Sequence, residues 1–145
     1  MHPRVKDVMT DPVATAMPGT TIGKVLKDMQ VHRLNGTVIV DDERHVLGVV
    51  TQGDVFRAVL PTEAEVAADE SYLLSADRLK EHITEALSRP VGAIMSSRVV
   101  SVSPEDPAVV AGGIMLEHRV KQLPVVEGGR LVGVVTIADI TKQFL

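Results

Sequence analysis

The sequence predicts a mixed α+β protein built from two repeated units, each with the order strand–helix–strand–strand–helix, and a helical connector between them. Two observations lead to this prediction. A set of residues recurs in the same order about 86 residues further along the chain. Within each copy, an apolar stripe of helical period precedes two β-rich runs. We expect the first unit (repeat one) to cover residues 1–60, the connector 61–90 and the second unit (repeat two) 91–145.

The repeat extends over the whole of each unit. At a constant offset, Pro18 corresponds to Pro104 and Met29 to Met115. The other matched segments are Val8-Met9-Thr10 with Ile94-Met95-Ser96, His32-Arg33 with His118-Arg119, and, after a one-residue deletion, Gly48-Val49-Val50-Thr51 with Gly133-Val134-Val135-Thr136 and Asp54 with Asp139. Because the matches keep their order throughout, chance similarity does not explain them.

Three β-rich runs are expected in each unit. The first is a short apolar strand, at residues 13–15 in repeat one and 99–102 in repeat two. The other two form a hairpin around a polar turn, which spans residues 41–45 in repeat one and 127–130 in repeat two. Neither unit is large enough for a robust core of its own, so we expect the two units to bury their apolar faces against each other.

Capping residues mark the helices of each unit. Thr20 or Thr21 can cap the first helix of repeat one, and Asp106 can cap the matching helix of repeat two. The last helix of each unit is expected to begin near Asp54 and near Asp139.

The connector is too long for a structureless loop inside a compact domain, and its sequence favours helix. Thr62 and Glu65 form a candidate capping box after Pro61. A stripe of apolar residues with helical spacing follows, and Arg89-Pro90 stops it. The members of this stripe are Tyr72, Ala76, Leu79, Ile83 and Leu87. One interpretation is a helix packed on its own module, and the other is a dimer or effector contact through the exposed part of the stripe.

The composition argues against several classes of function. The chain has no cysteine and five scattered histidines, which gives no metal-binding pattern. A net charge of −4 with only three aromatic residues argues against nucleic-acid binding as the function. There is no P-loop and no nucleophile–base pair, so we expect neither catalysis nor a cofactor. Without an apolar run of about 20 residues or a signal-peptide core, we expect a cytoplasmic protein without a membrane segment.

Both units close with the same motif, Gly48-Val49-Val50-Thr51-Gln52-Gly53-Asp54 and Gly133-Val134-Val135-Thr136-Ile137-Ala138-Asp139. With the Met-Thr or Met-Ser segment and the His-Arg pair of each unit, the chain resembles a tandem pair of cystathionine β-synthase (CBS) domains, or Bateman module. The resemblance covers nearly the whole chain except the connector. It implies two units related by a pseudo-two-fold axis, clefts near this axis that bind AMP, ADP, ATP or S-adenosylmethionine, and dimerisation into a flat disc.

The Thr-x-x-Asp spacing in both motifs has a physical rationale. Each Thr ends a strand, and each Asp lies near a helix start, where free N–H groups and the helix dipole favour anions. With the resemblance, this favours Asp54 and Asp139 as ribose-binding carboxylates, as in dinucleotide-binding folds. Thr51 and Thr136 would donate their hydroxyl groups to phosphate. The alternative is that both Asp residues only cap helices and both Thr residues are ordinary strand ends.

The basic residues at the end of each unit's first helix are candidate phosphate anchors, because Arg and Lys form charge-assisted hydrogen bonds. These residues are His32, Arg33, His118, Arg119 and Lys121. By family position, the ligand held by the Asp of one unit is reached by the cations of the other. Asp54 would work with His118, Arg119 and Lys121, and Asp139 with His32 and Arg33. The alternative is a solvated basic helix end that complements the helix dipole.

The candidate adenine pocket is apolar and is assigned by family position to Val13, Ala14, Val99 and Val100. The alternative for each of these residues is an ordinary place in the core.

The two clefts are not expected to be equal. Repeat one has Asn35 where repeat two has Lys121, so a third cation lies near only one phosphate position. Our hypothesis is that the cleft using Asp54 and the basic end of repeat two is the stronger site.

These observations predict a regulatory module that binds an adenine nucleotide of the AMP, ADP or ATP type, acts as an energy or metabolite sensor, and is not an enzyme. The alternatives are a structural or dimerisation module with unoccupied clefts, or a binder of S-adenosylmethionine or NADH. We expect a homodimer, with an effector protein as a further partner, and no contact with membranes or nucleic acid.

Overall fold

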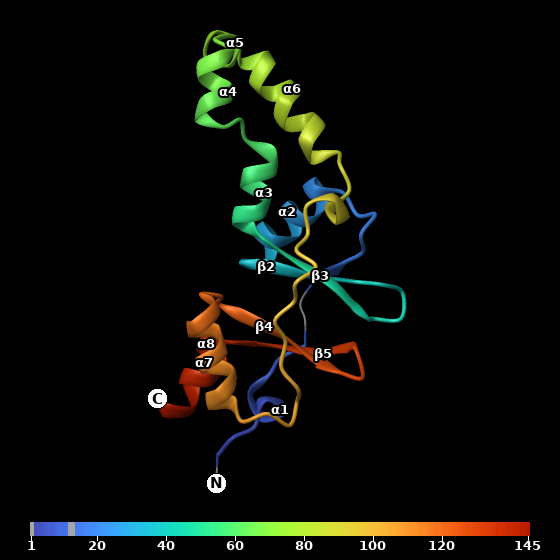
Figure 1. Ribbon diagram of the computed structural model, residues 1–145, viewed down its shortest axis with the longest axis vertical. Coiled ribbons are helices and arrows are strands. Elements are labelled where there is room, and N and C mark those ends of the chain that lie inside the picture. Colours follow the sequence, from blue (N-terminus) through green and yellow to red (C-terminus); the bar gives the residue numbers. More distant parts are fainter. Residues whose placement is uncertain (1, 12–13) are drawn as a thin grey trace.

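The molecule is elongated, with two small sheets next to each other and a helical arm at one end (Figure 1). The computed structural model describes residues 2–11 and 14–145. In chain order the elements are α1 (Val5–Val8), β1 (Thr15–Ala16), α2 (Ile22–His32), β2 (Gly36–Val40), β3 (Val46–Thr51), α3 (Gln52–Val59), α4 (Glu63–Ala68), α5 (Ser71–Leu74), α6 (Ala76–Leu87), η1 (Val91–Ala93), α7 (Ala108–His118), β4 (Gln122–Glu127), β5 (Arg130–Thr136), α8 (Ile137–Thr141) and η2 (Lys142–Phe144). This arrangement confirms the predicted α+β fold with two repeated units.

Repeat one contains a three-stranded sheet of order β1-β2-β3. Strand β1 is parallel to β2, with Thr15 opposite Val38, and β2 is antiparallel to β3, with Thr37 opposite Val50. Helices α2 and α3 cover one face of this sheet, where Ile39 and Val50 are completely buried beneath them. Thr21 caps α2 by accepting the N–H of Lys24, as predicted.

Repeat two differs at its first strand. Strands β4 and β5 form an antiparallel hairpin covered by α7 and α8, but the strand predicted at residues 99–102 is reduced to one parallel bridge between Val102 and Val125. The N–H of Val102 donates to the carbonyl of Pro124 at 3.1 Å. The next bond of this parallel ladder needs an N–H on Pro124, which proline lacks. The matching residue of repeat one is Val38, and there the strand forms.

The segments that lead into each repeat pack against the other repeat. Val5 and Val8 of α1 lie in the core of repeat two, and Val91, after the connector, lies in the core of repeat one. The N–H of Val5 donates to the carbonyl of Asp106 at 2.8 Å, and the N–H of Val91 donates to the carbonyl of Thr20 at 2.7 Å. The two repeats are therefore intertwined.

Two matched glycines make room for these leading segments. A β carbon on Gly48 would lie 2.7 Å from the Sδ of Met95, and one on Gly133 would lie 2.7 Å from the Sδ of Met9. Carbon and sulfur do not approach this closely without displacement. The close packing of the leading segments on β3 and β5 therefore requires glycine at both positions. Each repeat therefore has a Met near its start and a Gly near its end, because the Met of one repeat packs against the Gly of the other.

The connector forms three helices, α4 to α6, and the predicted stripe from Tyr72 to Leu87 is divided between α5 and α6. The Thr62 hydroxyl accepts the N–H of Glu65 at 3.1 Å and the Glu65 carboxylate accepts the N–H of Thr62, so the predicted capping box is confirmed. Ser75 breaks the stripe, because it is extended and its hydroxyl caps α6 by accepting the N–H of Arg78. Of the helices that the structure describes, none has the length and apolar content to cross a membrane.

The two hairpin turns contact each other. His45 and Arg130 form an antiparallel bridge, and the Asp41 carboxylate accepts the backbone N–H of His45 at 2.8 Å. Partial desolvation raises the pKa of Asp41, but hydrogen bonds from His45 and Glu43 outweigh it and hold the pKa below its ordinary value. This contact joins the two sheets at the turn ends of their strands.

Candidate functional site

Two clefts lie between the sheets, and the repeat relates one to the other. The larger cleft has a volume of about 340 Å³ and the smaller about 80 Å³. The larger cleft is lined by residues 35–38, 49–53, 98, 100 and 119–124. The smaller cleft is lined by Thr10, Asp11, Ala14, Leu34, Gly36, Val38, Gln122, Val134 and Thr136. Gly36, Val38 and Gln122 belong to both, so the clefts adjoin at the pseudo-two-fold axis.

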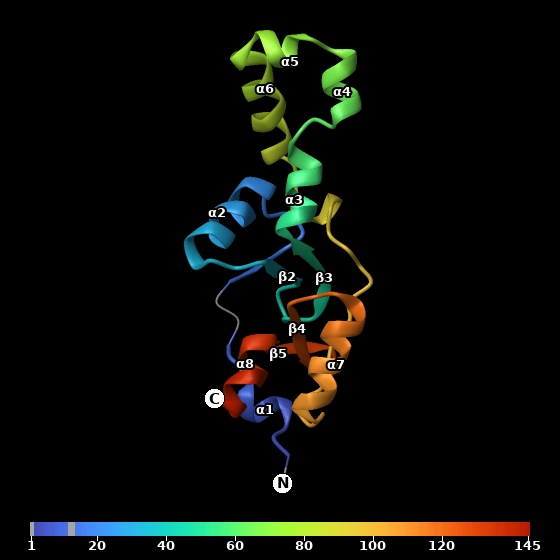
Figure 2. The ribbon, with the colours of Figure 1, turned by 90° about the vertical axis from the view of Figure 1, so that its left-hand side faces the viewer.

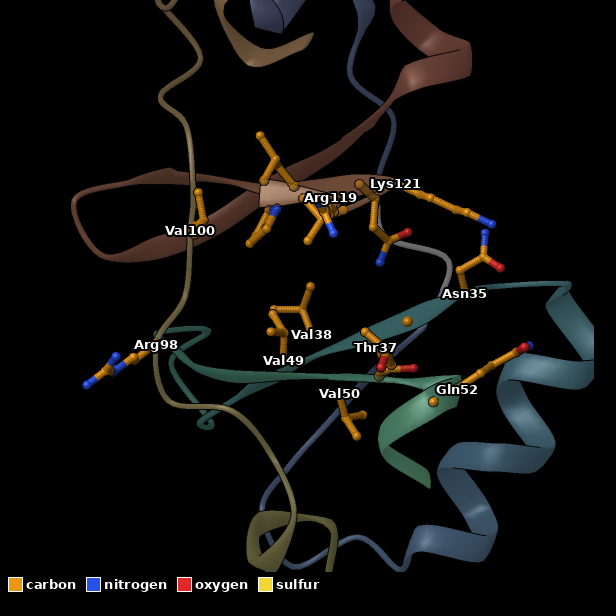
Figure 3. Close-up of a pocket in the computed structure, with 17 residues that line it drawn as sticks. Asn35, Thr37, Val38, Val49, Val50, Gln52, Arg98, Val100, Arg119 and Lys121 are labelled. Atoms are coloured by element: carbon orange, nitrogen blue, oxygen red, sulfur yellow. The ribbon is translucent and has the colours of Figure 1, made fainter. Parts of the chain in front are cut away.

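The floor of the larger cleft is apolar. Val38 and Val49 point into it from β2 and β3, whereas Val50 points to the opposite face of the sheet (Figure 3). The alternation of side chains along a strand accounts for this difference. Val100 lies along one side, on the segment that leads into repeat two. The three valines together form a hydrophobic slot.

Thr51 and Asp54 lie at the start of α3, at one end of the larger cleft. The Thr51 hydroxyl accepts the N–H of Asp54 at 3.2 Å, and the Oδ2 of Asp54 accepts the N–H of Thr51 at 2.8 Å. Thr51 and Gly53 line the cleft, but Asp54 does not. The Oδ1 of Asp54 is 2.6 Å from the Nη2 of Arg57. Both oxygens of this carboxylate are thus engaged within α3, and its side chain is 27% exposed.

Thr136 and Asp139 repeat this arrangement at the start of α8. The Thr136 hydroxyl accepts the N–H of Asp139 at 3.1 Å, and the Asp139 carboxylate accepts the N–H of Thr136 at 2.9 Å. Thr136 lines the smaller cleft, and Asp139 is buried, with 9% of its surface exposed. The capping role that the sequence left open is therefore present at both aspartates.

Cations border the larger cleft. Arg119 and Lys121, which follow α7, line it from repeat two, and Thr51 lines it from repeat one. The resemblance implied this combination of residues from the two repeats. Arg119 and its match Arg33 both have left-handed backbone at the end of a helix, with φ of 56° and 55°. Such a conformation is uncommon for a residue with a side chain. The left-handed residue ends α7 and turns the chain into β4.

Other residues nominated from the sequence lie outside the linings of both clefts. His32, Arg33, His118 and Val99 do not line either one, and Val13 lies outside the described residues. Ala14 lines the smaller cleft and Val100 the larger.

Sequence reasoning missed five polar residues that line the larger cleft, namely Asn35, Thr37, Gln52, Arg98 and Gln122. Asn35 and Gln122 follow the ends of α2 and α7, and Arg98 comes shortly before Val100. Arg98 and Lys121 lie at opposite rims, and Arg98 points outward (Figure 3). Arg98 could have been nominated from the sequence, because it is a cation two residues before Val100, which was assigned to the pocket. The described residues contain no group of three or more His, Asp or Glu placed to hold a metal ion.

Both repeats match one known family of domains. The family model for the CBS domain matches residues 5–61 and 91–145. The chain belongs to the CBS domain family. The segments matched are the two repeats, and the helical connector lies between them.

Curated relatives of this CBS pair include free-standing and longer proteins. The chain is 29% identical to the CBS domain-containing protein YhcV of Bacillus subtilis, over 94% of this chain and 81% of that protein. It is 30% identical to the uncharacterized protein MJ1404 of Methanocaldococcus jannaschii over 96% of this chain, but spans only 31% of that protein. It is also 30% identical to part of a homoserine O-acetyltransferase of Methanococcoides burtonii, and spans 24% of that enzyme.

Solved CBS structures share the fold. The CBS domain of a CBS domain-containing membrane protein from Sphaerobacter thermophilus is 28% identical, with a TM-score of 0.75 over 99% of this chain and 89% of that one. CBSX2, solved in complex with AMP, has a TM-score of 0.72 at 22% identity, over 98% and 96% of the two chains. The CBS pair of MJ0100, solved with 5-methylthioadenosine and S-adenosyl-L-methionine, has a TM-score of 0.71 at 23% identity, over 99% and 97%.

Proposed function

We propose that this CBS pair is a regulatory module that binds an adenine nucleotide of the AMP, ADP or ATP type in the larger cleft and catalyses no reaction itself. The observation that carries the proposal is the meeting of Thr51, from one repeat, with Arg119 and Lys121, from the other, around one cleft of about 340 Å³. Small-molecule sites have volumes of roughly 300–1,000 Å³ and combine an apolar lining with a few polar groups. The larger cleft has both properties.

The base would occupy the slot between Val38, Val49 and Val100. The phosphate would then lie between Thr51 and the cations Arg119 and Lys121. The Thr51 hydroxyl accepts the N–H of Asp54, so its own hydrogen remains free to be donated to a phosphate oxygen. Arg119 and Lys121 would add charge-assisted hydrogen bonds.

The ribose would be held by Asp54. Its carboxylate lies one residue beyond Gly53, which lines the cleft. Each carboxylate oxygen has more than one lone pair, so Asp54 can keep its cap on α3 and still accept from a ribose hydroxyl. The contact with Arg57 must loosen to leave Oδ1 fully open to the diol.

The smaller cleft would bind such a ligand more weakly, through Asp139 and Thr136. Its volume is about 80 Å³, and no Lys or Arg is among the described residues that line it. Asp11 lines it and would repel a phosphate. Asp139 is also more buried than Asp54.

The solved structures support an adenosine-containing ligand. CBSX2 was solved with AMP, and MJ0100 with 5-methylthioadenosine and S-adenosyl-L-methionine. Methylthioadenosine has no phosphate. Because two cations and Thr51 line the larger cleft of this chain, we favour a nucleotide over the other adenosine compounds.

We also propose that the module is a homodimer in which a second copy covers the outer face of α7. Val109 and Leu116 on this face are 66% and 75% exposed. A helix that is apolar on all sides is usually buried. The matching helix α2 carries a Lys24–Asp28 ion pair on its surface, so we expect the contact at repeat two. Analytical sedimentation would test this contact. We expect the parent protein to sediment as a dimer and Leu116→Glu to sediment as a monomer.

Calorimetric titration with AMP, ADP, ATP, S-adenosylmethionine and NADH tests the proposed ligand. We expect AMP to bind and to raise the melting temperature by mass action. We expect Asp54→Asn to lower the affinity for AMP about tenfold. Because Asn retains an acceptor at the start of α3, this loss reports on ribose binding and not on folding. Asp139→Asn should change affinity less than about twofold.

Two results would count against the proposal. Equal losses in the Asp54→Asn and Asp139→Asn proteins would contradict the assignment to the larger cleft. If none of the five compounds binds, the alternative of a dimerisation module with unoccupied clefts is correct.

A further inference from the structure

The helical arm, residues 61–85, projects beyond both sheets and contains no buried residue. Figures 1 and 2 show α4, α5 and the first part of α6 extending beyond α2 and the sheets. Helix α6 joins the body only near its end, where Ala86 lies in the core of repeat one and Leu87 contacts Gly23 of α2. Ile83 also packs against this core, and most of the residues from 61 to 85 are exposed.

The tip of the arm is nevertheless held in one conformation. The Tyr72 hydroxyl lies 3.0 Å from the Nδ1 of His82 and accepts from the Nη2 of Arg78 at 3.2 Å. The guanidinium of Arg78 lies 4.7 Å from the centre of the Tyr72 ring, a cation–π contact, and its Nε is 3.6 Å from Asp69. These contacts fix α5 against α6, so a partner would meet a preorganised surface.

The connector, residues 61–90, has the same net charge as the whole protein. Residues 61–90 contain seven acidic and three basic residues, a net charge of −4, which equals that of the full chain. The rest of the chain is balanced, with twelve residues of each sign. Within the arm, residues 61–77 contain five acidic residues and no Lys or Arg. We call residues 61–77 the acidic tip.

Two leucines stand out from the acidic tip. Leu73 and Leu74, on α5, are 76% and 81% exposed. Adjacent exposed leucines on a preorganised and otherwise charged surface are the pattern of an interaction site, in which an apolar centre is bordered by polar groups.

We propose that the acidic tip docks a partner protein whose surface presents an apolar groove bordered by Lys and Arg. Charge complementarity selects this occupant. A second arm would bring five further acidic residues against the first, and anionic lipid or nucleic acid would be repelled in the same way. Leu73 and Leu74 would fill the groove, and acidic residues such as Glu70 would face the basic border.

Helix α3 connects this surface to the larger cleft. Gln52 and Gly53, in its first turn, line the cleft, and Leu60 ends it shortly before α4 begins at Glu63. A ligand that shifts the start of α3 would therefore move the base of the arm. This coupling rests on the proposed function, whereas docking at the acidic tip does not.

A pair of synthetic peptides tests the docking surface with the full chain. One is a fluorescent amphipathic helix of leucine and lysine, about 14 residues long, and the other has glutamate in place of each lysine. We expect only the lysine peptide to bind, and to bind more weakly as salt rises. Leu74→Ser and Glu70→Lys should each weaken its binding at least about fivefold.

Matched controls come from the body of the molecule. Val31 on α2 is 65% exposed, and Glu127 is the last residue of β4, far from the arm in the chain, so Val31→Ser and Glu127→Lys should leave peptide binding unchanged. Circular dichroism would establish that all four variants are folded. The proposal fails if neither peptide binds, if both bind equally, or if Val31→Ser weakens binding as much as Leu74→Ser.

Two further measurements separate the other occupants. If Leu74→Ser changes the sedimentation of the chain alone, a second copy occupies the acidic tip and the proposal is wrong. Binding of the parent chain, but not Leu74→Ser, to phosphatidylglycerol vesicles would likewise assign the surface to lipid. Unchanged sedimentation and no vesicle binding support a basic protein partner.

Discussion

Arg57 holds Asp54 at the edge of the larger cleft, with 2.6 Å between Nη2 and Oδ1. The Arg57 side chain is 74% exposed, and its guanidinium lies over Gly53, which lines the cleft. In the matching position of repeat two, Lys142 follows Asp139 at the same spacing, but the described residues include no ion pair between them. The contact therefore distinguishes the two aspartates proposed to bind ribose.

Replacing Arg57 should strengthen nucleotide binding. Exposed ion pairs contribute about 0–1 kcal/mol, so freeing Asp54 in Arg57→Ala should lower the Kd for AMP by up to about fivefold. Titration calorimetry would measure the change, and Lys142→Ala is the control that should leave affinity unchanged. Weaker binding by Arg57→Ala would mean that Arg57 itself contacts the ligand, contrary to this expectation.

Arg119 and Arg33 offer a matched pair for testing the phosphate position. Both have left-handed backbone, with φ of 56° and 55°, but only Arg119 lines a cleft. We expect Arg119→Ala to weaken AMP binding about tenfold and to leave adenosine binding little changed. Arg33→Ala should have almost no effect on either. Comparable losses in both proteins would point to a general electrostatic effect and not to contact with the phosphate.

A single added methyl group at the contact between Gly48 and Met95 should lower the stability of the protein. In Gly48→Ala, the new carbon would meet the Met95 Sδ at 2.7 Å and the Ser96 carbonyl at 2.9 Å. We expect a loss of about 1–3 kcal/mol in the free energy of unfolding, measured with urea. Gly113→Ala is the control, because nothing lies within 4 Å of its β carbon and alanine favours the helix by about 1 kcal/mol. A Gly48→Ala protein as stable as the parent would contradict the packing described here.

Thr37 carries an unsatisfied hydroxyl. It is 3% exposed, and its Oγ1 is buried without a hydrogen-bond partner among the residues that the structure describes. Because Thr37→Val removes this hydroxyl and keeps the shape, we expect the free energy of unfolding to rise by about 1 kcal/mol. Thr37→Ser, which keeps the hydroxyl and loses the methyl group, should be destabilised. If Thr37→Val is the less stable protein, the hydroxyl has a partner, such as a buried water.

Much of the fold could be predicted from the sequence, because its signals are local. Helix caps depend on residues three positions apart, and Thr21 and Thr62 cap their helices as expected. The repeat itself predicted the first helix, the hairpin and the last helix of both units, and the motifs at Thr51 and Thr136. The prediction of a strand at residues 99–102 was wrong. Its pairing with β4 requires a backbone N–H at position 124, and Pro124 has none.

The larger cleft was less predictable, because its lining comes from distant parts of the chain. Thr51, Arg119 and Lys121 were nominated and line it, while Asn35, Arg98 and Gln122 were missed and His118 is absent from its lining. A family position fixes where a residue lies along the chain. It does not fix where a long side chain points, which packing against other elements decides.

The sequence by itself determined the repeated plan, the starts of α2, α3, α4 and α8, and the concentration of acidic residues in the connector, because these depend on neighbours in the chain. Tertiary structure alone decided which repeat each leading segment joins and how large each cleft is. The intertwining shows the reason. Met95 packs against Gly48, and Met9 packs against Gly133, so each contact joins one repeat to the other. Contacts of that kind are selected by shape and volume in three dimensions, which a local pattern does not record.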